Sequence, residues 1–110
     1  MAVTVKAIVV DTILPSSLSV APLYTSSNVT TIIDKFTVTN YSALAATFTV
    51  YTSTNADDSN IIIKEKTLMP KETYTCPEMV GQVINPAGTF NATASAATSI
   101  NIRVSGRQIS

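Results

Sequence analysis

The side chains that most often perform nucleophilic or acid–base chemistry are scarce in this chain. It contains no histidine and a single cysteine, Cys76. Serine and threonine are abundant, but a hydroxyl needs a neighbouring base to become a nucleophile. Without histidine a lysine would have to be that base, and Lys64, Lys66 and Lys71 show no spacing to a serine that indicates such a pair. Cys76 precedes a proline in an expected strand, which favours a small buried apolar residue.

The carboxylates form no pattern typical of catalysis or metal binding. Asp57 and Asp58 are adjacent in a polar loop whose oxygens could surround calcium, but the EF-hand spacing is absent and a solvated loop explains them better. A glycosidase needs two carboxylates about 5 to 9.5 Å apart, and nothing in the spacing of Glu65, Glu72 and Glu78 indicates such a pair. The sequence contains no set of Cys and His residues that could bind zinc, and its three glycines are too scattered for a phosphate-binding loop. We expect no catalytic residue, no metal and no cofactor, and therefore no enzyme.

Composition favours association with other proteins over binding of charged ligands. The formal net charge is zero, only 13% of residues are charged, and the mean hydropathy is +0.30. A neutral chain gives no reason to expect nucleic acid or an anionic membrane as partner, and no apolar run approaches the roughly 18 residues that span a bilayer. Such a surface protects a lone molecule poorly against self-association. The chain is thus expected to work inside an assembly.

The start of the chain and the cysteine content predict synthesis in a reducing cytoplasm. The segment 1–10 is too short and too interrupted for a secretory signal, and Cys76 has no partner for a disulfide. The sequons at Asn28, Asn40 and Asn91 are then expected to carry no glycan.

The elements that position these residues are strands. Seventeen threonines and twelve serines alternate with aliphatic and aromatic residues, which places apolar side chains on one face of a sheet and hydroxyls on the other. Eight or nine short strands at spacings near ten residues predict an all-β fold. We expect a single-domain antiparallel β-sandwich, jelly-roll-like, with residues 1–14 as an N-terminal strand or arm and residues 15–110 as the sandwich.

Two strand predictions can be tested in detail. The segments 29–40 and 46–53 are predicted to pair with one another, with one parity of the first (Ile32, Phe36, Val38) facing inward. In the second, Phe48 and Val50 are expected to face inward and Tyr51 outward. The segment 98–105 alternates most regularly, with Ile100, Ile102 and Val104 inward, and residues 106–110 are expected to be a tail.

The candidate binding residues lie mainly at the N-terminus, which holds more apolar residues than one half-buried strand needs. Two interpretations stay open for this segment: a surface arm that a partner covers, or a central strand buried on both faces. Exposed threonine faces and strand edges could also pair with a neighbour. The candidate interface consists of Ala2, Val3, Val5, Ile8, Val9, Val10 and, from a separate strand, Tyr51.

Several motifs resemble those of small structural proteins in the virions of tailed bacteriophages. The turn and strand Pro70-Lys71-Glu72-Thr73-Tyr74 and the following Cys76-Pro77-Glu78-Met79-Val80-Gly81 are similar to segments of that family, as is the ending Ser99–Ile109. Lys35–Asn40 and Phe48–Tyr51 also fit, so that the resemblance covers roughly residues 30–110.

This resemblance implies a capsid decoration protein of the cement or staple type. The expected partner is the major capsid protein, whose subunits the chain would join on the outer surface of the head, with a homo-oligomer on the capsid lattice as a further possibility. The location is then the capsid exterior of the virion, after synthesis in the host cytoplasm. The alternative is a receptor- or carbohydrate-binding module of a phage tail or fibre.

Overall fold

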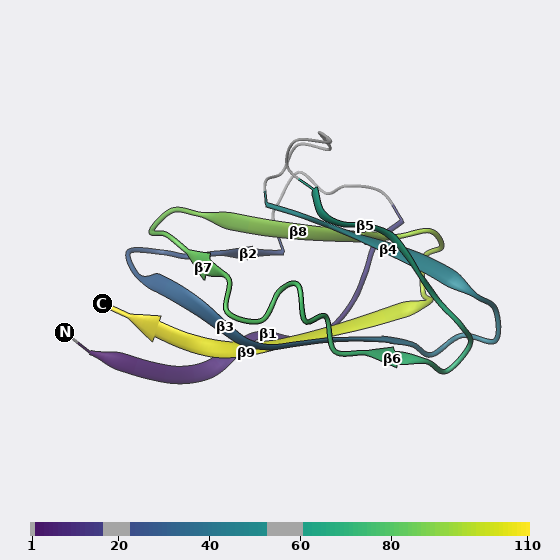
Figure 1. The fold of residues 1–110 in the computed structure, drawn as a ribbon, viewed down its shortest axis with the longest axis horizontal. Helices are drawn as coiled ribbons and strands as arrows, with labels where there is room; N and C mark the ends of the chain where they lie inside the picture. The colour runs from purple at the N-terminus through teal and green to yellow at the C-terminus, as the bar shows by residue number, and fades with distance from the viewer. Residues whose placement is uncertain (1, 17–22, 53–60) are drawn as a thin grey trace.

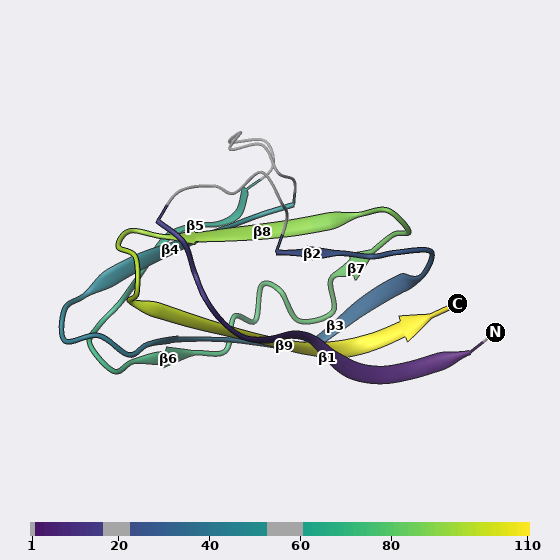
Figure 2. The same ribbon diagram turned by 180° about the vertical axis from the view of Figure 1, so that it is seen from behind.

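The computed structural model describes residues 2–16, 23–52 and 61–110, and these form a β-sandwich of two antiparallel sheets (Figures 1 and 2). The molecule is elongated, 45 × 25 × 20 Å, and both chain ends lie at the same end of it. Within the described residues no helix is long and apolar enough to cross a bilayer.

The first sheet contains the longest strands and both chain termini. Its order is β1, β9, β3 and then β6, while β7 pairs with another part of β3. The strands are β1 (Val3–Ile13), β9 (Ile100–Ile109), β3 (Thr30–Asn40), β6 (Thr73–Tyr74) and β7 (Val83–Ile84).

The second sheet lies across the core from the first and is built on β4 and β8. Its order is β2, β8, β4, β5, so that β2 and β5 are its edges. The strands are β2 (Tyr24–Thr25), β8 (Thr89–Ala94), β4 (Ala46–Tyr51) and β5 (Ile61–Leu68).

The strand order is that of a jelly roll, which confirms the predicted fold class. It also shows that the predicted pairing of 29–40 with 46–53 is wrong, because β3 and β4 lie in different sheets. The buried side chain of Asn40 holds the corner between them: its Nδ2 donates to the carbonyls of Leu44 (2.8 Å) and Leu68 (3.0 Å). Its Oδ1 accepts from the backbone N–H (3.0 Å) and the hydroxyl (2.7 Å) of Ser42. The chain therefore turns across the core instead of folding back into a hairpin.

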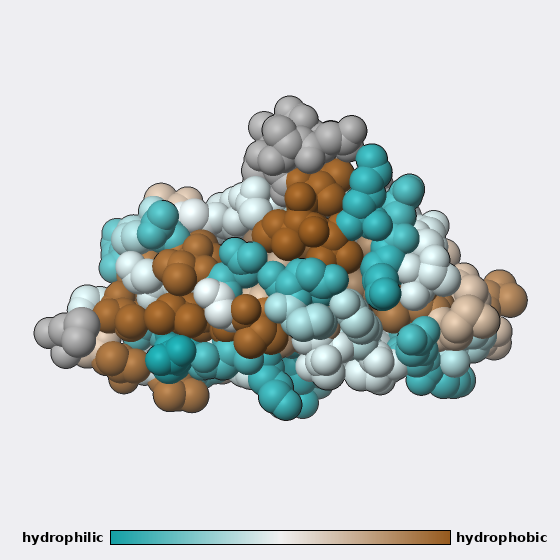
Figure 3. Space-filling view, viewed as in Figure 1, coloured by the Kyte–Doolittle hydropathy of each residue, from teal (hydrophilic) through white to brown (hydrophobic). Residues whose placement is uncertain are grey.

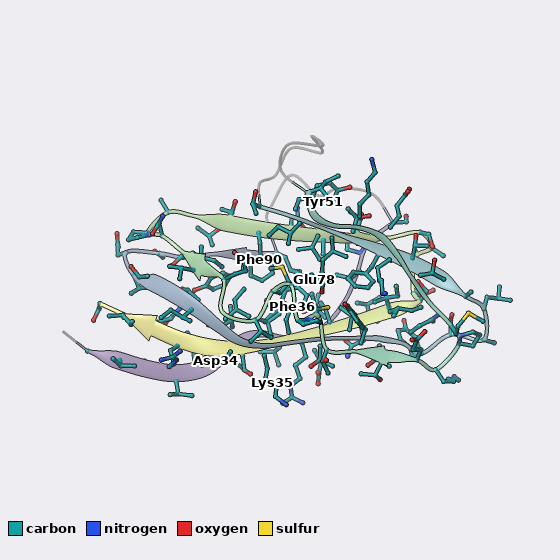
Figure 4. All side chains as sticks on the ribbon, in the orientation of Figure 1. Asp34, Lys35, Phe36, Tyr51, Glu78 and Phe90 are labelled. Carbon is teal, nitrogen blue, oxygen red and sulfur yellow. The ribbon has the colours of Figure 1, made fainter. Side chains whose placement is uncertain are left out.

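The core forms between the two sheets, where the apolar faces of their alternating strands meet. Phe36 and Phe90 face one another from opposite sheets, with ring centroids 5.8 Å apart, and Figure 4 shows both between the layers. The inward parities predicted for β4 and β9 are confirmed, since these side chains are essentially unexposed: Phe48, Val50, Ile100, Ile102 and Val104.

A β-bulge reverses the predicted parity in the first half of β3. The register with β9 shifts between Ile33 and Lys35, so one residue, Asp34, is extra. An extra residue in a strand moves all side chains before it to the opposite face. Ile33 is consequently buried in the core and Ile32, predicted to face inward, lies on the outer face.

One further prediction fails at the C-terminal end of the chain. Residues 106–110 are not a tail, because β9 continues to Ile109 and pairs with both β1 and β3. β7 is short, since only Val83–Ile84 pair with β3 and the residues before them form turns.

Candidate association surfaces

The residues that could do chemistry are held in structural roles. Cys76 is fully buried, and burial raises the pKa of its thiol to about 12, so the thiol is protonated at neutral pH. The Tyr74 hydroxyl donates to the carboxylate of Glu78 at 2.9 and 3.0 Å, and this hydrogen bond raises the pKa of Tyr74. Lys66 lies 4.8 Å from the centre of the Tyr74 ring. These contacts are of the kind that fix a loop against a strand.

The described carboxylates also have structural roles and lie apart from one another. Glu72 accepts a hydrogen bond from the backbone N–H of Met69 at 2.7 Å and closes a turn. The acidic loop with Asp57 and Asp58 lies outside the described residues. Among the residues that the structure describes, no group of three or more His, Cys, Asp or Glu side chains is placed to hold a metal ion.

The N-terminal half of β1 is the most exposed strand segment among the described residues. Val3 and Val5 expose 54% and 77% of their surface, and every residue from 2 to 7 is exposed, although the segment pairs regularly with β9. The second half turns inward at two register shifts, and there Ile8 and Val9 join the core. Of the predicted interface residues in this strand, Ala2, Val3, Val5 and Val10 are therefore at the surface and Ile8 and Val9 are not.

Among the residues that the structure describes, no strand pairs with the edge of β1 that faces away from β9. Ala2 and Ser110 exchange two backbone hydrogen bonds (3.3 and 3.0 Å), so they form a hydrogen-bonded pair. Such pairs alternate along an antiparallel ladder. In the register given, the N–H and C=O groups of Val3, Val5 and Ala7 consequently point away from β9, where no strand of the described residues follows.

An apolar outer face is continuous with this edge. Val5 of β1 lies beside Arg107 of β9, which lies beside Ile32 of β3, which lies beside Val83 of β7. Val3 lies beside Ile109 in the next row. We call this surface the terminal face, and it consists of Val3, Val5, Ile32, Val83, Arg107 and Ile109. Figure 3 shows apolar surface gathered at this end, over the region where Figure 1 places β1, β9, β3 and β7.

The one cation in the terminal face is paired. The Arg107 guanidinium donates to both carboxylate oxygens of Asp34, with Nε–Oδ2 and Nη2–Oδ1 distances of 3.0 Å. The bulge that turned Ile32 outward also brings Asp34 to this position. Because the two charges satisfy one another, the terminal face presents aliphatic side chains around a neutral pair.

Tyr51, predicted to face outward, lies on the outside of the second sheet, away from the terminal face (Figure 4). It borders a hollow of about 210 Å³ whose other walls are mostly hydroxyl-bearing residues: Ser16, Thr47, Thr49, Thr93 and Ser95. Thr49 lies directly opposite Thr93 there. Glu65 supplies the one carboxylate among the described lining residues.

A second groove, of about 440 Å³, lies beside the bulge of β3. It is bordered by Asp34 and Lys35 on one side and by Thr75, Pro77 and Val80 on the other. Figure 4 shows Lys35 pointing away from the core.

Sequence reasoning found the β1 part of the terminal face and missed the rest. The alternating pattern predicts that Ile32 faces the core and that Ile109 lies in a tail. It gives no indication that Val83 lies at the surface. The available signal was the pair of adjacent isoleucines at 32 and 33, since only one of two neighbouring strand residues can face the core.

Comparisons of the chain with protein-family models, with curated proteins and with solved structures find no match.

Proposed function

We propose that this chain is a non-enzymatic capsid decoration protein, which binds the outer surface of a phage head and stabilises contacts between major capsid subunits. The observation that carries the proposal is the terminal face together with the unpaired edge of β1. Exposed aliphatic side chains and free backbone groups in one place are what another protein chain covers. The resemblance of residues 30–110 to small virion proteins supplies the class of partner.

The zero net charge of the chain supports the same proposal. A clamp of zero net charge is held by shape, apolar contact and backbone pairing, and salt weakens these less than it weakens ion pairs. A ligand that binds only the assembled lattice stabilises it by RT ln(1 + [L]/Kd) at each site. Many copies on one head multiply that stabilisation against the pressure of the packaged genome.

The test is binding to heads that lack the protein. We expect the wild-type chain to co-sediment with such heads to saturation and to raise the temperature at which they release their genome. Val3→Asp places a carboxylate beside Ile109, apart from Arg107, and so puts an unpaired charge in the terminal face that should abolish binding. Thr75→Asp, the same charge change in the loop after β6, should not. A wild-type chain that stays in the supernatant at every concentration would refute the proposal.

A second candidate function rests on the hollow beside Tyr51. Hydroxyl groups, one carboxylate and one aromatic ring are the groups that bind sugars, so the alternative is a receptor- or carbohydrate-binding module of a phage tail or fibre. It predicts measurable affinity for glycans that Tyr51→Ala removes. Glycan binding without head binding would favour this alternative.

A further inference from the structure

We infer that two copies of this chain pair through the N-terminal halves of their β1 strands, antiparallel and related by a two-fold axis at Val5. The first sheets of the two copies would then join into one continuous sheet. This inference does not rest on the proposed function, because it concerns the protein in solution.

The first argument is the set of free backbone groups. Val3, Val5 and Ala7 each direct an N–H and a C=O away from β9, at even spacing and without a register shift among them. With the axis at Val5, this residue pairs with its own copy, and Val3 pairs with Ala7 of the second copy. Each of these pairs is of the hydrogen-bonded type, which exchanges two N–H···O bonds. All the outward groups of the segment are thereby satisfied.

The second argument is the complementarity of the side chains. In this register Val3, Val5 and Ala7 line one face of the joint, continuous with the terminal faces of both copies. On the other face Thr4 lies directly opposite Lys6 of the second copy, so no like charges are directly opposed across the joint. A two-fold axis makes every favourable contact occur twice, as an isologous interface requires.

The third argument is that this edge has few of the features that usually prevent pairing. Natural edge strands are protected by proline, bulges, charged side chains (lysine above all) or a covering helix or loop. Residues 2–7 contain one charge, Lys6, and no proline, and they are exposed on both faces. The bulges of β1 come later, after Ala7, and they limit the joint to the N-terminal half.

The short joint determines the strength of the dimer. A single strand pair of this length buries much less than the roughly 1,600 Å² of a standard stable interface. We therefore expect a weak dimer in solution, with a Kd of about a micromolar or above. The same contact becomes strong when a surface holds two copies close together, because the effective concentration is then about millimolar.

The test measures the monomer–dimer equilibrium by sedimentation velocity over a wide range of concentrations. Val5→Pro removes the central outward N–H and should leave a folded monomer, since proline is tolerated in an edge strand where the N–H faces solvent. Thr4→Lys brings two lysines together at both symmetric contacts and should raise Kd about 2-fold to 30-fold. Thr4→Glu should lower Kd by a similar factor, and Thr75→Lys, the same charge change on the far side of the sheet, should leave it unchanged.

A cross-link tests the position of the axis. Residues in a hydrogen-bonded antiparallel pair have Cα atoms about 5.5 Å apart, which suits a disulfide. Val5→Cys should give a covalent dimer under mild oxidation, whereas Val83→Cys, also exposed (55%) but away from the edge, should cross-link far more slowly. A protein that stays monomeric at millimolar concentration would overturn the inference. So would a dimer whose Kd responds to neither Val5→Pro nor the Thr4 variants.

Discussion

Replacing Gly106 with alanine is expected to destabilise the fold severely, because Gly106 lies in β9 between β1 and β3 at the point where the β3 bulge begins. A Cβ there would collide with the carbonyl oxygen of Ile32 and lie 3.2 Å from its carbonyl carbon and 3.3 Å from the Cα of Ile33. These are backbone atoms of a central strand, which cannot rotate away as a side chain can. Overpacking of a core costs about 1–3 kcal/mol, and contact with backbone places Gly106→Ala at the upper end, about 3 kcal/mol.

Urea denaturation measures this loss. With a urea dependence of about 1–3 kcal/mol/M for a small domain, a loss of about 3 kcal/mol should lower the midpoint by roughly 1–3 M. Gly81→Ala is the matched control, because Gly81 has a φ of +88° and no atom within 4 Å of an added Cβ. There the left-handed conformation costs about 1–2 kcal/mol, and the lower entropy of the unfolded chain offsets about 0.4–1 kcal/mol of it. If Gly106→Ala is as stable as wild type, or less harmful than Gly81→Ala, the register of β1, β9 and β3 is wrong.

Three further predictions concern buried and paired groups. Asn40→Asp replaces the amide that donates to the Leu68 carbonyl by a carboxylate, which can only accept, so the pKa of the new carboxyl is raised. The free energy of unfolding should fall by about 2–4 kcal/mol at pH 7, and urea denaturation should show a smaller loss at pH 4, where the carboxyl is protonated and can donate. Equal losses at both pH values would contradict this account. The raised pKa of Cys76 means that the folded protein favours the protonated thiol, so stability should be lost as the pH rises from the ordinary thiol pKa of 9.0 toward about 12. A thiol reagent at pH 8 should react only with unfolded protein. A double-mutant cycle on Arg107 and Asp34 should give a coupling energy of about 0.5 kcal/mol that salt reduces, because both side chains are more than 40% exposed. A coupling energy above about 2 kcal/mol would show that the ion pair is buried away from solvent.

The fold class could be predicted because it depends on alternation that is uninterrupted in most strands. Ile100, Ile102 and Val104 face the core as their spacing indicates, and so do Phe48 and Val50. The pairing of strands could not be predicted in the same way. Neighbours in sequence usually pair, but the hydrogen bonds of Asn40 turn the chain from one sheet into the other, and a single buried amide gives no signal in the pattern.

The candidate surface was predictable only where it lies within one strand. Val3 and Val5 stand out because β1 carries more apolar residues than one core-facing strand needs. Ile8 and Val9 belong to the core because a bulge after Ala7 changes the parity of the strand. The rest of the terminal face comes from β9, β3 and β7, whose proximity depends on pairing between distant segments and on a second bulge at Asp34.

Amide hydrogen exchange along β1 tests the central claim, that the N-terminal half of this strand is where the protein binds, most directly. In dilute protein the amides of Val3, Val5 and Ala7 should exchange fast, while those of Thr4 and Lys6, which point to β9, should exchange slowly. At high concentration, and on phage heads, the first three amides should become protected and the other two should change little. If the first three still exchange fast in the associated state while another segment gains protection, the association surface lies elsewhere and the account is contradicted.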